Sequence, residues 1–176
     1  MAVAPFNLRT GQRAERKLLV TIAEWTETTG TSSTVVREIL GTRTEDSSIE
    51  YNADIETTTD ILGNNYTDLN KTQPQQTFDA SPIIGGEKLK ALLNDIRRRN
   101  AVSELNQFTI YVVTLFTGSA GAYPTEKHTD CTITYDSIGG DVKLNFPYTV
   151  YYSNKITTGT IDKLAEDFVF TPDVNV

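Results

Sequence analysis

The chain has 176 residues, with 16 Lys and Arg against 23 Asp and Glu, which gives a formal net charge of −7. One Cys cannot close an internal disulfide, and one Cys with one His cannot build a His/Cys zinc site. The acidic charge also argues against a protein that grips nucleic-acid phosphates. The length suits a single domain, 1–176, and the many β-branched Thr residues favour strands.

No targeting or membrane-spanning segment is expected. The N-terminus lacks a basic flank followed by a continuous apolar core, so it does not resemble a signal peptide. The longest apolar run, residues 110–116, is far shorter than the roughly 20 residues of a membrane-spanning helix. These observations predict a soluble protein made in the cytoplasm, with no membrane partner.

The first strands are predicted before residue 41. Residues 17–25 place Leu18, Val20 and Ile22 on one face, which indicates a strand. The polar residues 26–33 predict a turn. Residues 35–40 predict either a short second strand or a helical turn.

Residues 49–61 carry the clearest pattern, a period of two sustained over about thirteen residues. One face is weakly apolar and rich in Thr. The other face carries four carboxylates: Glu50, Asp54, Glu56 and Asp60. At roughly 3.3 Å per residue this strand would span about 40 Å, about twice the length of an ordinary strand.

A return strand is predicted to follow. Residues 63–65 (GNN) are typical of a turn, and the polar residues 66–78 would run back antiparallel. The result would be a long hairpin, about 41–78, with little core of its own. Alone, a two-stranded ribbon is marginal in water and leaves two edges open. Two interpretations follow: the ribbon pairs with copies of itself in a ring, or it is an exposed hairpin whose charges prevent aggregation.

Residues 86–99 predict an amphipathic helix, because Leu89, Leu92, Leu93 and Ile96 form one apolar stripe. Its last turn carries three cations that complement the helix dipole: Arg97, Arg98 and Arg99. Two interpretations of this run stay open. It is either a solvated helix end or a contact with acidic residues of a neighbouring subunit.

The rest of the chain predicts more strands. Residues 107–116 indicate a central strand, residues 117–130 a loop, and residues 131–136 an alternating strand. A turn at 139–141 would lead to a return over 142–146, and residues 148–152 and 155–161 predict two further strands. The fold class expected is mainly β, an antiparallel sandwich or barrel with one α-helix packed on it and a long protruding hairpin.

No catalytic or cofactor-binding motif is present. His128 is the only histidine, and its polar neighbourhood predicts an exposed loop residue. Cys131 begins an alternating strand and is interpreted as a small core residue rather than a nucleophile. No phosphate loop, calcium loop or nucleophile elbow occurs. We therefore expect no enzyme activity, no cofactor and no metal.

The order of elements resembles the tail tube (major tail) proteins of tailed bacteriophages and related phage-tail-like particles. The resemblance covers roughly residues 45–165. It lies in residues 48–63 (SIEYNADIETTTDILG), 77–79 (TFD) and 146–160 (FPYTVYYSNKITTGT). It is a resemblance of pattern and order, with no signature motif.

The resemblance implies a structural protein of the virion tail, assembled in the host cytoplasm. It implies hexameric rings stacked into a hollow tube whose β-barrel lumen lets double-stranded DNA pass without specific binding. Implied partners are other copies of the chain and the tape measure, tail terminator and baseplate proteins. The family has no catalytic residues.

That resemblance suggests a role for the acidic face. Phosphates that pass Glu50, Asp54, Glu56 and Asp60 would be repelled, whereas Lys or Arg there would retain the DNA. We therefore hypothesise that this face lines the lumen. The terminal arms, residues 1–15 and 173–176, would either reach neighbouring rings or be frayed ends.

Three other functions remain as alternatives. The chain could be a tail completion or baseplate hub protein that forms one ring. It could be a monomeric β-sandwich binding module. An enzyme is the most distant of these alternatives.

Overall fold

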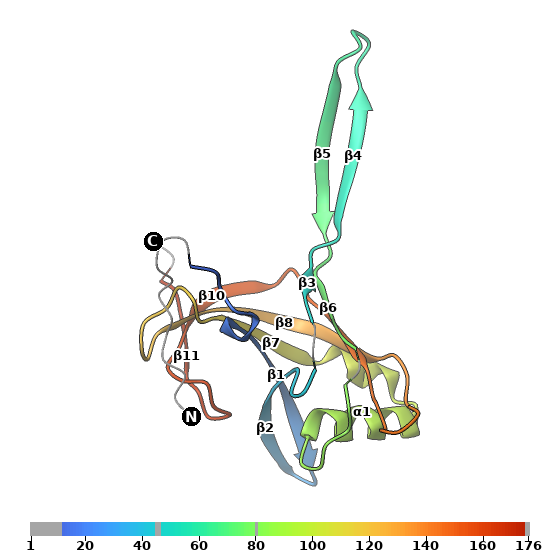
Figure 1. Ribbon diagram of the computed structural model, residues 1–176, viewed down its shortest axis with the longest axis vertical. Coiled ribbons are helices and arrows are strands. Elements are labelled where there is room, and N and C mark those ends of the chain that lie inside the picture. The colour runs from blue at the N-terminus through green and yellow to red at the C-terminus, as the bar shows by residue number, and fades with distance from the viewer. Residues whose placement is uncertain (1–11, 45–46, 80, 175–176) are drawn as a thin grey trace.

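A computed structural model describes residues 12–44, 47–79 and 81–174, and it is mainly antiparallel β with a single α-helix in this part of the chain (Figure 1). The expected fold class is confirmed. The elements are η1 (Arg16–Leu18), β1 (Leu19–Thr29), β2 (Ser32–Ile39), β3 (Ile49–Glu50), β4 (Ala53–Thr59), β5 (Asn65–Thr72), β6 (Gln75–Phe78), α1 (Lys88–Arg99), η2 (Val102–Asn106), β7 (Phe108–Thr114), β8 (Tyr123–Tyr135), β9 (Tyr148–Tyr151), β10 (Ile156–Ile161) and β11 (Phe170–Pro172).

The main sheet follows the order β2-β1-β7-β8-β9-β6-β3, and β10 and β11 branch from β8. The long strand β8 belongs to two parts of this sheet. Its first half pairs with β7 and β10, and its second half pairs with β9. A register shift opposite Phe108–Ile110 and a left-handed Asp130 (φ 58°) mark the junction. This bulge lets the sheet fold over on itself.

The larger core lies between the two parts of the folded sheet. Trp25, Phe108 and Ile110 from β1 and β7 belong to the same buried cluster as Phe78 and Val150 from β6 and β9. Helix α1 packs into this cluster through its buried side chains Leu89, Leu93 and Ile96. The predicted helix and its apolar stripe are confirmed, with Leu92 only partly buried.

A second core covers the opposite face of β1 and β7. It contains Ile22, Tyr111 and Val113, and Ile161 and Phe168 from the C-terminal part of the chain cover them. Strand β7 is therefore buried on both faces. The prediction of a central strand in residues 107–116 is confirmed, because a nearly continuous apolar run is what burial on both faces requires.

Helix α1 is capped by a side chain from another element. The Glu38 carboxylate on β2 accepts hydrogen bonds from the backbone N–H groups of Lys88 (2.6 Å) and Leu89 (3.1 Å). Burial outweighs these two bonds and raises the pKa of Glu38 above 4.5. At the other end, Asn100 adopts the left-handed conformation that terminates helices.

A buried polar link joins the two parts of the sheet. Gln76 on β6 has no exposed surface, and its Oε1 accepts hydrogen bonds from Thr21 Oγ1 (3.0 Å) and Tyr152 Oη (2.6 Å). Burial raises the pKa of the Tyr152 hydroxyl, which keeps it protonated as a donor. The link ties β1, β6 and the residue after β9 together below the hairpin.

Three expected element boundaries in the body of the molecule were wrong. Residues 26–29 continue β1, since β-branched Thr suits a strand, and only Gly30 (φ 63°) and Thr31 form the turn. The predicted loop 117–130 is half strand, because β8 begins at Tyr123 and accommodates Pro124 near its start. The predicted strand 142–146 is an irregular segment with isolated bridges.

We predict that Gln76→Ala lowers the free energy of unfolding by about 1–3 kcal/mol, because two buried hydroxyl groups lose their acceptor. Urea unfolding followed by fluorescence measures this change. Gln75→Ala is the matched control, since Gln75 points to the other face of the same strand. An unchanged unfolding midpoint in Gln76→Ala would contradict the importance of the link.

Candidate assembly surface

The protruding hairpin is formed by β4 and β5, which pair only with each other within the described residues. Figure 1 shows it standing away from the body of the molecule. All seven residues of β4 are exposed, as are all but the last of β5. Neither outer edge has a neighbouring strand in the described chain, so backbone N–H and C=O groups along both edges face solvent.

The predicted single strand over residues 49–61 is divided in the structure. Strand β3 ends at Glu50, and Asn52 adopts a left-handed conformation (φ 41°) that interrupts the extended chain. Asn tolerates this conformation better than most residues. Its amide donates to the carbonyl of Gln73 (3.2 Å), and Pro74 separates β5 from β6 on the returning side. Both strands therefore break at the same level.

The four predicted carboxylates do not share one strand. Glu50 lies on β3 in the body, and only Asp54 and Glu56 lie on β4. In the hairpin register, Glu56 is opposite Asp68 and Asp54 is opposite Lys71. One face of the hairpin thus has three carboxylates and one ammonium group. Sequence reasoning missed Asp68, although it lies within the polar return segment that was expected to face the acidic strand.

The opposite face of the hairpin is weakly apolar. Ile55 and Leu69 are directly opposite each other and are both more than half exposed. Beyond them, Thr57 pairs with Thr67. A strand pair with one polar face and one exposed apolar face is typical of a sheet that another surface will cover.

Asp60 forms the turn instead of the acidic face. Its Oδ1 accepts hydrogen bonds from the backbone N–H groups of Leu62 and Asn64, both at 2.8 Å. Its Oδ2 accepts from the Asn64 side chain (3.0 Å) and from Tyr66 Oη (3.1 Å). These donors, the Asn64 side chain foremost, hold the pKa of Asp60 below 3.8. The turn presents Ile61 and Leu62 to solvent.

The body adds a second polar surface next to the hairpin base. On the outer face of the β8-β9-β6-β3 sheet, one row consists of Thr132, Tyr151, Gln75 and Glu50. The next row is Thr134, Thr149 and Thr77, of which Thr149 is buried and donates to Asp136 Oδ2. Neither row contains Lys or Arg. This face is therefore neutral to acidic.

Two of the three arginines at the end of α1 form side-chain hydrogen bonds within the chain. Arg99 donates two 2.8 Å hydrogen bonds to the Glu104 carboxylate and a third (2.7 Å) to Asp95, and this pairing lowers the pKa of Glu104. Arg97 bonds the side-chain oxygen of Asn94. Arg98 is exposed and has no side-chain partner among the described residues.

His128 and Cys131 are both in the core. The expectation of an exposed His128 was wrong: its side chain is buried on β8, with Nδ1 at 3.3 Å from the Ser153 carbonyl and its ring against Tyr152. The interpretation of Cys131 as a core residue is confirmed, since it is fully buried and burial raises the pKa of its thiol.

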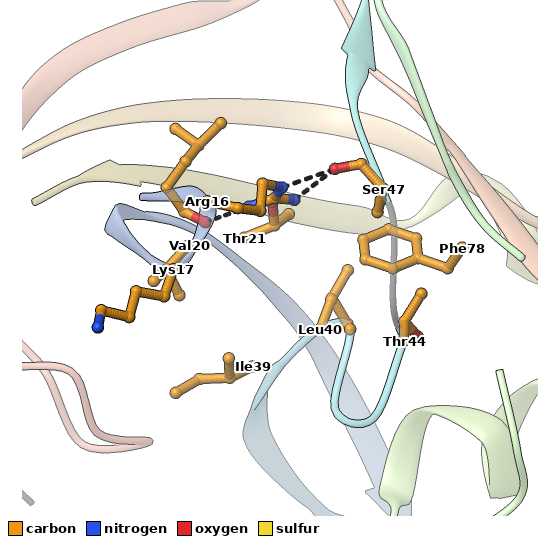
Figure 2. Close-up of a pocket in the computed structure, with 11 residues that line it drawn as sticks. Arg16, Lys17, Val20, Thr21, Ile39, Leu40, Thr44, Ser47 and Phe78 are labelled. Carbon is orange, nitrogen blue, oxygen red and sulfur yellow. Dashed lines mark hydrogen bonds between the residues drawn. The ribbon is translucent and has the colours of Figure 1, made fainter. Parts of the chain in front are cut away.

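A pocket of about 310 Å³ opens beside η1 and the start of β1 (Figure 2). Arg16 spans it, because Nε and Nη2 donate to the carbonyl of Ser47 (2.8 and 2.6 Å) and Nη1 donates to Leu19 (2.6 Å). The apolar lining includes Leu19, Val20, Ile39, Leu40 and Phe78, and Lys17 adds a second cation.

The described residues offer no group of three or more His, Cys, Asp or Glu side chains that could hold a metal ion. Helix α1 is too short and polar to cross a membrane, and no other helix in the described ranges qualifies. Of the two terminal arms predicted from the sequence, residues 1–11 and 175–176 lie outside the described residues.

Comparison with known proteins finds a structural likeness but no sequence match. No family model matches the chain, and no curated protein matches its sequence. Among solved structures, the chain is similar to one in the cryo-EM structure of an extracellular contractile injection system, the PVC sheath–tube complex in its extended state. That match has 12% identity and a TM-score of 0.44 over 85% of this chain and 93% of the other. A likeness at this level carries no conclusion about function.

We predict that the Asp60 carboxyl titrates below pH 3.8. Because the folded pKa is lowered, the carboxylate stabilises the turn above about pH 3.8, and this contribution is lost as the pH falls through the folded value. Carbon-detected NMR of the carboxyl measures the midpoint. A midpoint for Asp60 at or above pH 3.8 would contradict the turn geometry.

Proposed function

We propose that the chain is a structural subunit that assembles with copies of itself into rings and then into a hollow tube. The observation that carries the proposal is the exposed β4–β5 hairpin with two unpaired edges. Natural proteins usually shorten, cover or charge such edges. Pairing the edges of neighbouring copies around a ring would satisfy the backbone groups and remove both edges at once.

The strand count limits how such a ring can be built. In the hexameric ring that the resemblance implies, the six two-stranded hairpins would supply twelve strands. Barrels that leave an aqueous channel have roughly 16 to 18 strands. We therefore infer that the wall includes strands from the body. The β8-β9-β6-β3 sheet is suited to this role, since β3 and β6 lead directly into the hairpin and its outer face is polar.

The electrostatics support a passage for DNA. Asp54, Glu56 and Asp68 on one hairpin face, and Glu50 on the outer sheet face, would repel phosphates. Lys71 is the exception on the hairpin face and weakens the repulsion locally. We propose that these two surfaces together line the lumen, with the apolar Ile55–Leu69 face of the hairpin against a neighbouring subunit.

The sequence resemblance to tail tube proteins suggests the biological setting. In that setting, hexameric rings stack into a virion tail tube. The tape measure, terminator and baseplate proteins would be partners, and double-stranded DNA would pass through without being bound. A sheath-containing or sheathless tail would use the same tube.

Negative-stain electron microscopy of the purified protein tests the proposed function. We expect hollow tubes of constant diameter. Isolated rings would favour the alternative of a tail completion or baseplate hub protein. Featureless monomers at all concentrations would contradict self-assembly and favour a monomeric binding module.

The acidic lumen gives a second prediction. Replacing Asp54, Glu56 and Asp68 together by Lys should leave tubes that trap short duplex DNA and protect it from nuclease, because ammonium groups retain phosphates. The matched control replaces three exposed body carboxylates, Asp79, Asp141 and Asp173. Equal nuclease protection in both variants, or none in the hairpin variant, would contradict a luminal hairpin face.

The arginine run gives a third prediction. We propose that Arg98 contacts acidic residues of a neighbouring subunit, since Arg97 and Arg99 already have partners within the chain. Arg98→Glu should reduce tube yield without changing the thermal midpoint of the monomer. Arg99→Ala should lower the midpoint slightly, because it breaks the bonds to Glu104. Wild-type tube yield for Arg98→Glu would disprove the contact.

A further inference from the structure

The tip of the hairpin presents an unusual pair of side chains. Ile61 is fully exposed and Leu62 is 81% exposed, so both are turned out into solvent. The turn that carries them is held by the four hydrogen bonds to Asp60 and by Gly63, whose φ of 83° suits a residue without a Cβ. Two large apolar side chains on a well-bonded turn are costly in water unless another surface covers them.

The pocket beside η1 is the hollow that could receive these side chains. Its lining mixes apolar residues, Val20 and the mostly buried Leu40 and Phe78 among them, with polar residues such as Thr44 and Ser47, and Ile39 at the rim is 40% exposed. Figure 2 shows Lys17 on the side of the pocket away from Phe78, and Arg16 reaching across it to Ser47. The pocket thus places apolar side chains next to the Arg16 guanidinium and the Lys17 ammonium, which pairs with Glu15, whereas the tip combines an apolar pair with the carboxylate of Asp60.

We propose that Ile61 and Leu62 at the hairpin tip of one copy insert into the Arg16–Phe78 pocket of another copy, with Asp60 next to its two cations. The tip stands at the far end of the hairpin, well away from the pocket of its own chain (Figure 1), so the contact joins two molecules. It pairs unlike surfaces, and such head-to-tail contacts can repeat without limit along a polymer. This inference rests on the proposed function and assigns the contact to stacking between rings.

Disulfide trapping tests the contact directly. Leu62→Cys protein is mixed with Ile39→Cys protein under mild oxidation, and the products are separated without reductant and mapped by mass spectrometry. The native Cys131 has no exposed surface and does not compete. We expect at least about tenfold more of the mixed 62–39 disulfide than with Val142→Cys as the partner, because docking raises the local thiol concentration. Val142 is a suitable control since it is 91% exposed and lies outside the pocket.

Two results would overturn the proposal. The first is a 62–39 disulfide no more abundant than the 62–142 control. The second comes from the double variant Ile39→Cys with Phe6→Cys. An efficient disulfide between positions 39 and 6 of the same chain would assign the pocket to the first eleven residues.

The double variant Ile61→Ser with Leu62→Ser separates this inference from the proposed function. We expect it to form rings that no longer stack, while Val142→Ser forms tubes as the wild type does. Tubes from the double variant would overturn tip docking and leave ring assembly intact. If the wild type forms neither rings nor tubes, the proposed function fails and the tip contact fails with it.

Discussion

Two strands with free edges expose unpaired backbone groups that can pair with other chains. The rest of the structure depends on this constraint. The β4–β5 hairpin forms all its hydrogen bonds within one pair, so each strand exposes a row of backbone donors and acceptors. The body is more complete, because β7 lies between β1 and β8, and residues 125–128 of β8 pair with β7 on one side and with β10 on the other. This difference between body and hairpin is the basis of our proposal that other copies of the chain complete the hairpin.

The body holds the hairpin by its base. Gln76, Thr21 and Tyr152 form a buried link below it, and Asn52 and Pro74 break both strands at the same level. The base of the hairpin is thereby anchored in the core, whereas β4 and β5 contribute no described residue to either core. The Ile55–Leu69 face and the Ile61–Leu62 tip have the same property: both are apolar surfaces that are exposed to water in the single chain.

Local patterns predicted much of this fold. The stripe of Leu89, Leu93 and Ile96 predicted α1, and the period of two over residues 49–61 predicted one long strand, which the structure divides at Asn52. What failed depends on long-range contacts. His128 looks exposed from its neighbours, yet Tyr152 and Ser153 bury it. Asp60 continues the alternation in the sequence, yet four local donors draw it into the turn. Asn52 was the local signal for the break between β3 and β4. That Asp68 lies opposite Glu56 could be known only from the register of the hairpin.

The most direct measurement of the central claim is amide hydrogen exchange across residues 53–72, compared between dilute monomer and concentrated assembly. If hairpin edges pair between copies, the outward amides of both β4 and β5 become strongly protected on assembly, while β7 amides, already paired, change little. Exchange in residues 53–72 that is equally fast in the two states would contradict the account.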